Sequence, residues 1–201
     1  PNKISFVYNN HNKLSEGVLF LSQILKSISE DEFKNKIKIR FNNILDGFDR
    51  YSNGLLEYNG DNDSFKIKEG CFINFFNEAL ELNKGKVIID LYIKDLENES
   101  LARLLEVLDE RDKNILIDNI NKQEIKSAYF ELNNKDLMSF ITRLNTRELF
   151  FCTIYFMEKP MTIWGNYNLS FPMFFEGNNM LEIYRDLAKK HNLDVRGIVL
   201  K

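Results

Sequence analysis

The stretch from Leu149 to Phe175 constrains this chain more than any other, because it is the most apolar and aromatic part of the sequence. Its first part, Glu148 to Met157, carries apolar side chains at both odd and even positions. A strand with that pattern is buried on both faces and lies in the interior of a sheet. We therefore expect a central strand there, followed by strands at Met161 to Gly165 and Leu169 to Phe175, with a turn at residues 166–168 between them.

The rest of the chain alternates between strand and helix patterns. Strand-like runs lie at Lys3–Tyr8, Lys36–Phe41, Lys86–Lys94, Glu124–Leu132 and Val195–Leu200. Apolar residues at steps of three and four predict helices at Ser15–Ser29, Cys71–Leu82, Leu101–Leu108, Lys135–Leu144 and Met180–His191. Helix caps are expected at Ser29, at Asn133 or Asn134, and at Asn178 or Asn179. These elements predict a single α+β or α/β domain over residues 1–201, with a mixed, largely antiparallel sheet and helices packed on it.

Turn and breaker residues add two expectations. Pro172 has no backbone donor, so the strand that contains it should lie at a sheet edge or carry a bulge. The loosest segment is 42–69, where Asn-Gly and Asp-Gly turn signals are dense. Within it we expect Leu55–Tyr58 and Phe65–Lys68 to pair as a hairpin across Asn59 to Asp63.

Charge and cysteine content limit the classes of function. A net charge of −3 and an isoelectric point near 5.6 argue against a surface devoted to nucleic acid, which needs a basic face. Cys71 and Cys152 lie in apolar runs and are interpreted as reduced core thiols, which favours the cytoplasm. We expect no membrane span, because no apolar run is long enough, and no signal peptide, because the start PNKISFVYNNHNK lacks an apolar core. The excess of Asn, Ile and Lys over Ala and Arg indicates an AT-rich genome, such as that of a low-GC bacterium.

Most catalytic and metal-binding patterns are missing from the sequence. Two cysteines and two isolated histidines do not form a structural zinc site, and neither the glycine-rich phosphate loops nor the G-x-S-x-G elbow occurs, so we expect no cofactor. Asp90 lies inside the apolar run VIIDLYI, where a charge must face solvent, a partner or a site. One hypothesis is therefore an enzyme with carboxylate-based chemistry around Asp90 and the loop Asp46–Arg50. The simpler interpretation is that Asp90 caps a neighbouring element or pairs with a Lys.

Two surfaces are candidates for binding another protein. The segment Asp95 to Glu124 has nine acidic and four basic residues, so a helical face within it would attract a basic partner. The residues assigned to this face are Glu106, Asp109, Glu110 and Asp112. The second surface is the turn that carries Trp164 and Tyr167, because exposed aromatic residues anchor protein interfaces. A solvated helix face and a Trp164 packed in the core are the structural alternatives.

These features lead to our main functional hypothesis, a small cytoplasmic inhibitor that binds a basic protein, for example an immunity protein that neutralises a nuclease-like toxin. The hypothesis combines the single domain, the reduced thiols, the missing catalytic motifs, the acidic face and the aromatic turn. The carboxylate enzyme is the alternative. The two differ in surface shape, because an enzyme needs a concave pocket where polar groups converge, whereas a blocking protein presents a flat or convex acidic surface.

Overall fold

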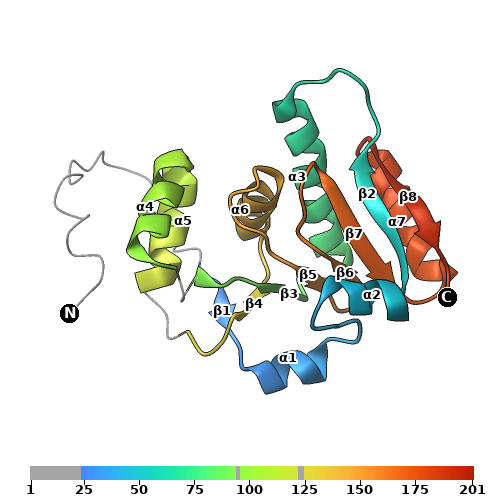
Figure 1. Cartoon of the computed structure of the whole chain (residues 1–201), viewed down its shortest axis with the longest axis horizontal. Coiled ribbons are helices and arrows are strands. Elements are labelled where there is room, and N and C mark those ends of the chain that lie inside the picture. Colours follow the sequence, from blue (N-terminus) through green and yellow to red (C-terminus); the bar gives the residue numbers. More distant parts are fainter. Residues whose placement is uncertain (1–23, 94–95, 122–124) are drawn as a thin grey trace.

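An eight-stranded antiparallel sheet forms the centre of the computed structural model, which describes residues 24–93, 96–121 and 125–201 (Figure 1). Its strands are β1 (Lys26–Ser27), β2 (Ser52–Tyr58), β3 (Val87–Asp90), β4 (Tyr129–Leu132), β5 (Ile154–Phe156), β6 (Met161–Ile163), β7 (Ser170–Phe175) and β8 (Leu193–Val199). They lie in the order β1-β4-β3-β5-β6-β7-β2-β8, and each pair of neighbours is antiparallel. The expected α+β class with a largely antiparallel sheet is confirmed.

Seven helices within the described residues pack against this sheet (Figure 1). They are α1 (Glu30–Lys36), α2 (Ile44–Arg50), α3 (Phe65–Leu82), α4 (Asn98–Val107), α5 (Glu110–Asn121), α6 (Lys135–Thr146) and α7 (Asn178–Lys190). Helices α3 to α7 supply the main hydrophobic core, whereas α1 and α2 supply two smaller clusters. Strand β3 separates them, because Val87 and Ile89 face the main core and Ile88 faces the cluster of α1.

Local sequence signals set several helix ends. Ser29 and Glu32 form the expected capping box at the start of α1. Asn134, one of the two expected candidates, caps α6 through its side-chain oxygen. The asparagine cap expected for α7 is wrong, because the helix starts directly after Gly177, which has no side chain to act as a cap.

The expected central strand Glu148 to Met157 is only partly correct. Strand β5 does lie inside the sheet, between β3 and β6, but it has only three residues. The preceding residues are held by Asn145 at the end of α6, whose side chain accepts a hydrogen bond from Cys152 N–H at 2.8 Å and donates one to Cys152 C=O at 3.1 Å. These two bonds replace ladder bonds, so the chain leaves the strand conformation and Phe151 is only half-buried.

Pro172 lies in an interior strand, so the expectation of an edge strand is wrong. Strand β7 lies between β6 and β2. The Pro172 carbonyl accepts a hydrogen bond from Trp164 N–H at 2.9 Å, and both backbone groups of an antiparallel residue point to the same neighbour. The side of Pro172 that lacks an N–H donor therefore faces Trp164, just after the end of β6. The ladder between β7 and β2 keeps all of its hydrogen bonds.

The strand expected at Lys36–Phe41 does not form. Residues 36–41 do alternate, since Ile37 and Ile39 are buried while Lys38 and Arg40 are exposed. This segment crosses the face of the sheet instead of pairing with an edge, and the hydroxyl of Thr162 in β6 donates to the Ile39 carbonyl at 2.6 Å.

The hairpin expected within residues 42–69 does not form, because β7 and β8 occupy both sides of β2 and Phe65 starts α3. Within this segment, every residue of the loop 59–64 is exposed. The expected strand Lys3–Tyr8 and most of the expected helix Ser15–Ser29 lie outside the described residues. The end of that helix prediction is wrong, because Lys26 and Ser27 form β1.

Candidate functional site

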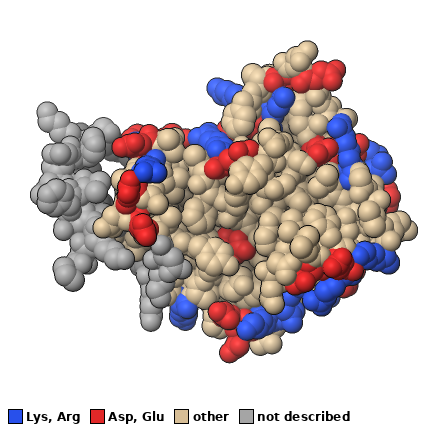
Figure 2. All heavy atoms as spheres, viewed as in Figure 1, with Lys and Arg blue, Asp and Glu red and all other residues tan. Residues whose placement is uncertain are grey.

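The acidic residues of α4 and α5 lie mainly on the outside of this helix pair, which sits at the end of the molecule near β1 (Figure 1). Figure 2 shows Asp and Glu side chains gathered over these helices, with few Lys and Arg among them. We call the exposed members the acidic surface, which comprises Glu97, Glu99, Glu106, Asp109 and Glu110. Asp112 does not belong to it, because its side chain is 0% exposed, which corrects its assignment to an exposed acidic face.

Asp112 instead anchors α5 to α6. Its carboxylate accepts two hydrogen bonds from the Arg143 guanidinium, at 2.6 Å from Nε and 2.5 Å from Nη2. Two helical turns further along α5, the Asn119 side chain accepts a hydrogen bond from Leu25 N–H at 2.7 Å. Both polar side chains lie on the buried stripe of α5, so they fix the helix, and with it the acidic surface, to the body of the protein.

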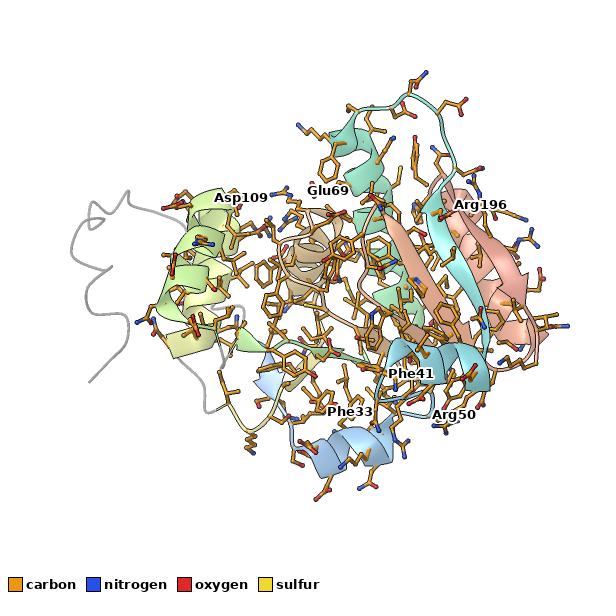
Figure 3. The ribbon with its side chains drawn as sticks, in the orientation of Figure 1. Phe33, Phe41, Arg50, Glu69, Asp109 and Arg196 are labelled. Carbon is orange, nitrogen blue, oxygen red and sulfur yellow. The ribbon has the colours of Figure 1, made fainter. Side chains whose placement is uncertain are left out.

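A second buried ion pair joins the C-terminal end of α6 to α3. Glu69 of α3 accepts hydrogen bonds from Arg147 at 2.7 and 2.9 Å and from the Thr146 hydroxyl at 3.0 Å. The hydrogen bond to Glu69 raises the pKa of Arg147. Figure 3 shows Glu69 on α3 and Asp109 at the start of α5, with α6 between these helices.

Sequence reasoning missed both buried pairs. A signal was present in the spacing of Arg143 and Arg147, which lie four residues apart and so share one face of a helix. Their acidic partners come from two other helices, and no local pattern indicates them.

Part of the acidic surface is paired within its own helices. Glu99 contacts Arg103 at 2.5 Å, and Glu110 contacts Lys113 at 2.9 Å. The acidic members of these pairs are 75% and 85% exposed, so each pair is well solvated and contributes little to stability. The side chains remain accessible to a partner.

Asp109 has a structural role in addition to its exposure. Its carboxylate accepts a hydrogen bond from Asp112 N–H at 2.9 Å, which is the pattern of a helix N-cap at the start of α5. Glu97 and Glu106 are exposed and form no ion pair with any other described residue. Of the acidic surface, these two side chains therefore contribute least to the stability of the fold.

The structure separates the two aromatic residues of the 164–167 turn. Trp164 is half-buried and stacks on Phe41 with ring centroids 5.6 Å apart, beside the cluster built by α2. Tyr167 is 58% exposed and meets the half-buried ring of Phe151 edge-on at 4.6 Å. Tyr167 and Phe151, which we call the aromatic pair, fit a binding surface better than Trp164 does.

The C-terminal end of α6 connects the acidic surface to the aromatic pair. Arg143 contacts Asp112 of α5, and Arg147 lies one turn further along. The next residue, Glu148, accepts a hydrogen bond from Asn168 N–H at 2.8 Å, which holds the loop that carries Tyr167. The two sequence-predicted surfaces are therefore attached to the same helix.

Asp90 is held as a structural carboxylate. It is 8% exposed and accepts hydrogen bonds from Thr153 N–H at 2.5 Å and from the Tyr155 hydroxyl at 3.4 Å. Its own N–H donates to the Thr153 carbonyl at 3.1 Å, so the residue joins the end of β3 to the start of β5. Burial raises the pKa of Asp90 to about 6, because the carboxylate has lost water and no cation of the described residues compensates for that loss.

The other part of the enzyme hypothesis, the loop Asp46–Arg50, is the helix α2. Asp46 accepts a hydrogen bond from the Asn43 side chain at 2.9 Å within the cap of that helix. Two open hollows, of about 590 and 220 Å³, share Gly85 and Asn133 in their linings, and neither is lined by Asp90 or α2. Within the described ranges, no group of three or more His, Cys, Asp or Glu side chains could hold a metal ion.

Comparison of the chain with protein-family models, with curated proteins and with solved structures finds no match. In the part of the chain that the structure describes, no helix is both long and apolar enough to cross a membrane.

Proposed function

We propose that this protein is a cytoplasmic interaction protein that binds and blocks a basic protein partner through the acidic surface of α4 and α5. In its most specific form, the proposal is a bacterial immunity protein that neutralises a nuclease-like toxin. The observation that supports it most is that one helix pair combines exposed carboxylates with two buried polar side chains, Asp112 and Asn119, that fix it to the rest of the protein. Two free thiols, at Cys71 and Cys152, agree with a reducing compartment.

Charge supports a basic partner. Between residues 96 and 121 the chain has seven acidic and three basic side chains, and one acidic side chain, Asp112, is already neutralised by Arg143. A surface of one sign raises the association rate of an oppositely charged partner and rejects partners of the same sign.

Rigidity supports binding as well. The Asp112 and Asn119 contacts fix α5 on the folded body, so the acidic surface is in place before a partner arrives. A preorganised surface loses less conformational entropy on binding than a mobile one. The aromatic pair, which lies beyond the C-terminal end of α6, offers apolar area of the kind that anchors interfaces.

The test is a charge reversal with a matched control. The variant Glu97→Lys, Glu106→Lys and Glu110→Lys leaves Asp109 in place, because Asp109 caps α5. The control variant Glu176→Lys, Glu182→Lys and Asp186→Lys makes the same change in net charge at exposed positions in and just before α7. The partner is first captured from the native cells, identified by mass spectrometry and produced separately.

Binding of the purified pair is then measured by stopped-flow and calorimetry at several salt concentrations. We expect the α4–α5 variant to lower the association rate constant by more than about tenfold, and salt to weaken wild-type binding. The α7 variant should bind like the wild type, and both variants should keep the wild-type melting temperature. Equal binding by wild type and the α4–α5 variant, or equal losses in the two variants, would contradict the proposal.

We do not propose the enzyme centred on Asp90. Its carboxylate is buried, is committed to Thr153 and Tyr155, and lines neither hollow. Its raised pKa follows from burial and needs no catalytic explanation.

A further inference from the structure

The loop after β2 exposes an Asn-Gly pair to solvent. Asn59 and Gly60 belong to the loop 59–64, in which every residue is exposed. Among the described residues, Gly60 N–H donates to no backbone or side-chain acceptor. The Gly60 nitrogen is therefore accessible for attack on the side-chain amide of Asn59, and glycine offers no side chain to hinder that approach.

Arg196 of β8 holds the amide that would be attacked. Its guanidinium donates from Nη2 to Asn59 Oδ1 at 3.0 Å, while Asn59 N–H donates to the Asn192 carbonyl at 2.8 Å. A positive donor on the amide oxygen makes Cγ more electrophilic and stabilises the oxyanion that forms on attack. The backbone contact keeps the residue in place during that step.

We propose that Asn59-Gly60 is a self-modification site, promoted by Arg196, with water as its only co-reactant. The Gly60 nitrogen gives its proton to a solvent base and forms a bond to Asn59 Cγ. The amide nitrogen takes up a proton from the solvent, its bond to Cγ breaks, ammonia leaves, and a succinimide ring remains. Water then opens the ring and leaves an aspartyl or isoaspartyl residue at position 59. No atom is oxidised or reduced, and the product adds one negative charge beside Arg196.

The protein contains an internal control at Asn53-Gly54. Asn53 is 5% exposed, and its side-chain nitrogen donates to the Tyr51 carbonyl at 3.0 Å. Gly54 lies inside β2 between β7 and β8. Its surroundings are tightly packed, because a Cβ atom added at Gly54 would lie only 2.7 Å from the Val195 side chain. Cyclisation at this pair requires the strand to leave the sheet, so the fold protects it.

The experiment follows both pairs in the intact protein. The protein is incubated in mildly alkaline buffer, digested, and analysed by mass spectrometry with isoaspartyl detection. Because reaction at Asn53 requires local unfolding, we expect Asn59 to convert at least about tenfold faster than Asn53. Arg196→Ala should slow conversion at Asn59 by roughly fivefold to tenfold, since it removes the donor to the developing oxyanion. Lys189→Ala, an exposed change in α7, should leave the rate unchanged.

Arg196→Lys distinguishes promotion by charge from a general disturbance of the loop. This variant retains a cation near Asn59 and should recover part of the wild-type rate. Conversion at Asn59 that is no faster than at Asn53 would overturn the proposal. Equal or faster conversion in both Arg196 variants would also overturn it, because the guanidinium would then restrain the amide and not activate it. The result is independent of partner binding, since neither pair belongs to the acidic surface.

Discussion

The carboxylates around α6 and those over α4 and α5 have the same chemistry but opposite environments. Asp112 and Glu69 are 0% and 6% exposed, and each is matched by an arginine. Glu99 and Glu106 lie in solvent. A buried carboxylate without a cation is strongly destabilising, whereas an exposed one carries almost no penalty. The comparison indicates that the buried carboxylates attach α5 and α3 to the C-terminal part of α6, and that the exposed ones can be changed without harming the fold.

The largest expected effect is the loss of the cation opposite Asp112. Arg143→Met leaves a fully buried charge without its partner, so we expect the free energy of unfolding to fall by about 3–5 kcal/mol. Urea denaturation at neutral pH measures this change. Adding Asp112→Leu to the same protein should recover most of the loss, because an apolar pair of similar volume needs no counter-charge. A small loss in the single variant would show that water replaces the guanidinium. The buried carboxylate would then not need its arginine, contrary to the contrast drawn above.

Arg147→Met should have a smaller effect of the same sign. Glu69 keeps its hydrogen bond from the Thr146 hydroxyl, and the Arg147 side chain is 29% exposed, so water can replace part of the lost contact. We expect a loss of about 1.5–3 kcal/mol in the same denaturation measurement. Arg147→Lys should recover only part of it, because an ammonium does not reproduce the two parallel bonds of the guanidinium. A loss larger than that of Arg143→Met would reverse the expected order of the two pairs.

Asp90 extends this contrast, because it is a buried carboxylate with no cationic partner among the described residues. Burial raises its pKa to about 6 from its ordinary value of 3.8, so the native state binds this proton more tightly than the unfolded state. The resulting stabilisation is complete below the unfolded pKa and is lost as pH rises through about 6. Ionised Asp90 therefore weakens the fold at neutral pH.

Asp90→Asn removes this ionisation and keeps an oxygen that can accept from Thr153 N–H. We expect the variant to gain about 1–2 kcal/mol relative to the wild type between roughly pH 4 and pH 8. The difference between the two denaturation curves isolates Asp90 from other acids, such as Glu131, whose pKa is lowered by Lys26 and Lys36. Parallel curves over this range would show that Asp90 is solvated or already paired.

Local chemistry made much of the fold predictable. The capping signals at Ser29 and Asn134 depend on a few neighbouring residues, and both are confirmed. Two of the strand errors came from side-chain contacts that the strand patterns do not encode. Residues 149–152 have a strand pattern but are tied to Asn145, and residues 36–41 alternate but cross the sheet face because Thr162 holds them there.

The candidate site shows the same limit. The exposure of Glu106 and Asp109 agrees with a solvated helical face, which a sequence pattern can indicate. The burial of Asp112 was also readable, because it shares a stripe of α5 with Ile115 and Leu116 at steps of three and four. Its pairing with Arg143, thirty-one residues away, could not be read from any local pattern.

The smallest expected effect lies on the acidic surface itself. Glu99→Gln and Glu110→Gln each remove one helical ion pair whose acidic side chain is 75% or 85% exposed. Such pairs contribute little because water screens them and ordering two long side chains opposes the attraction. We expect each variant to unfold within about 0.5 kcal/mol of the wild type in urea, and the two changes to add when combined. A loss above about 1 kcal/mol would show that these exposed carboxylates stabilise the helix pair as the buried ones do. The contrast between buried carboxylates that support the fold and exposed ones that do not would then be wrong.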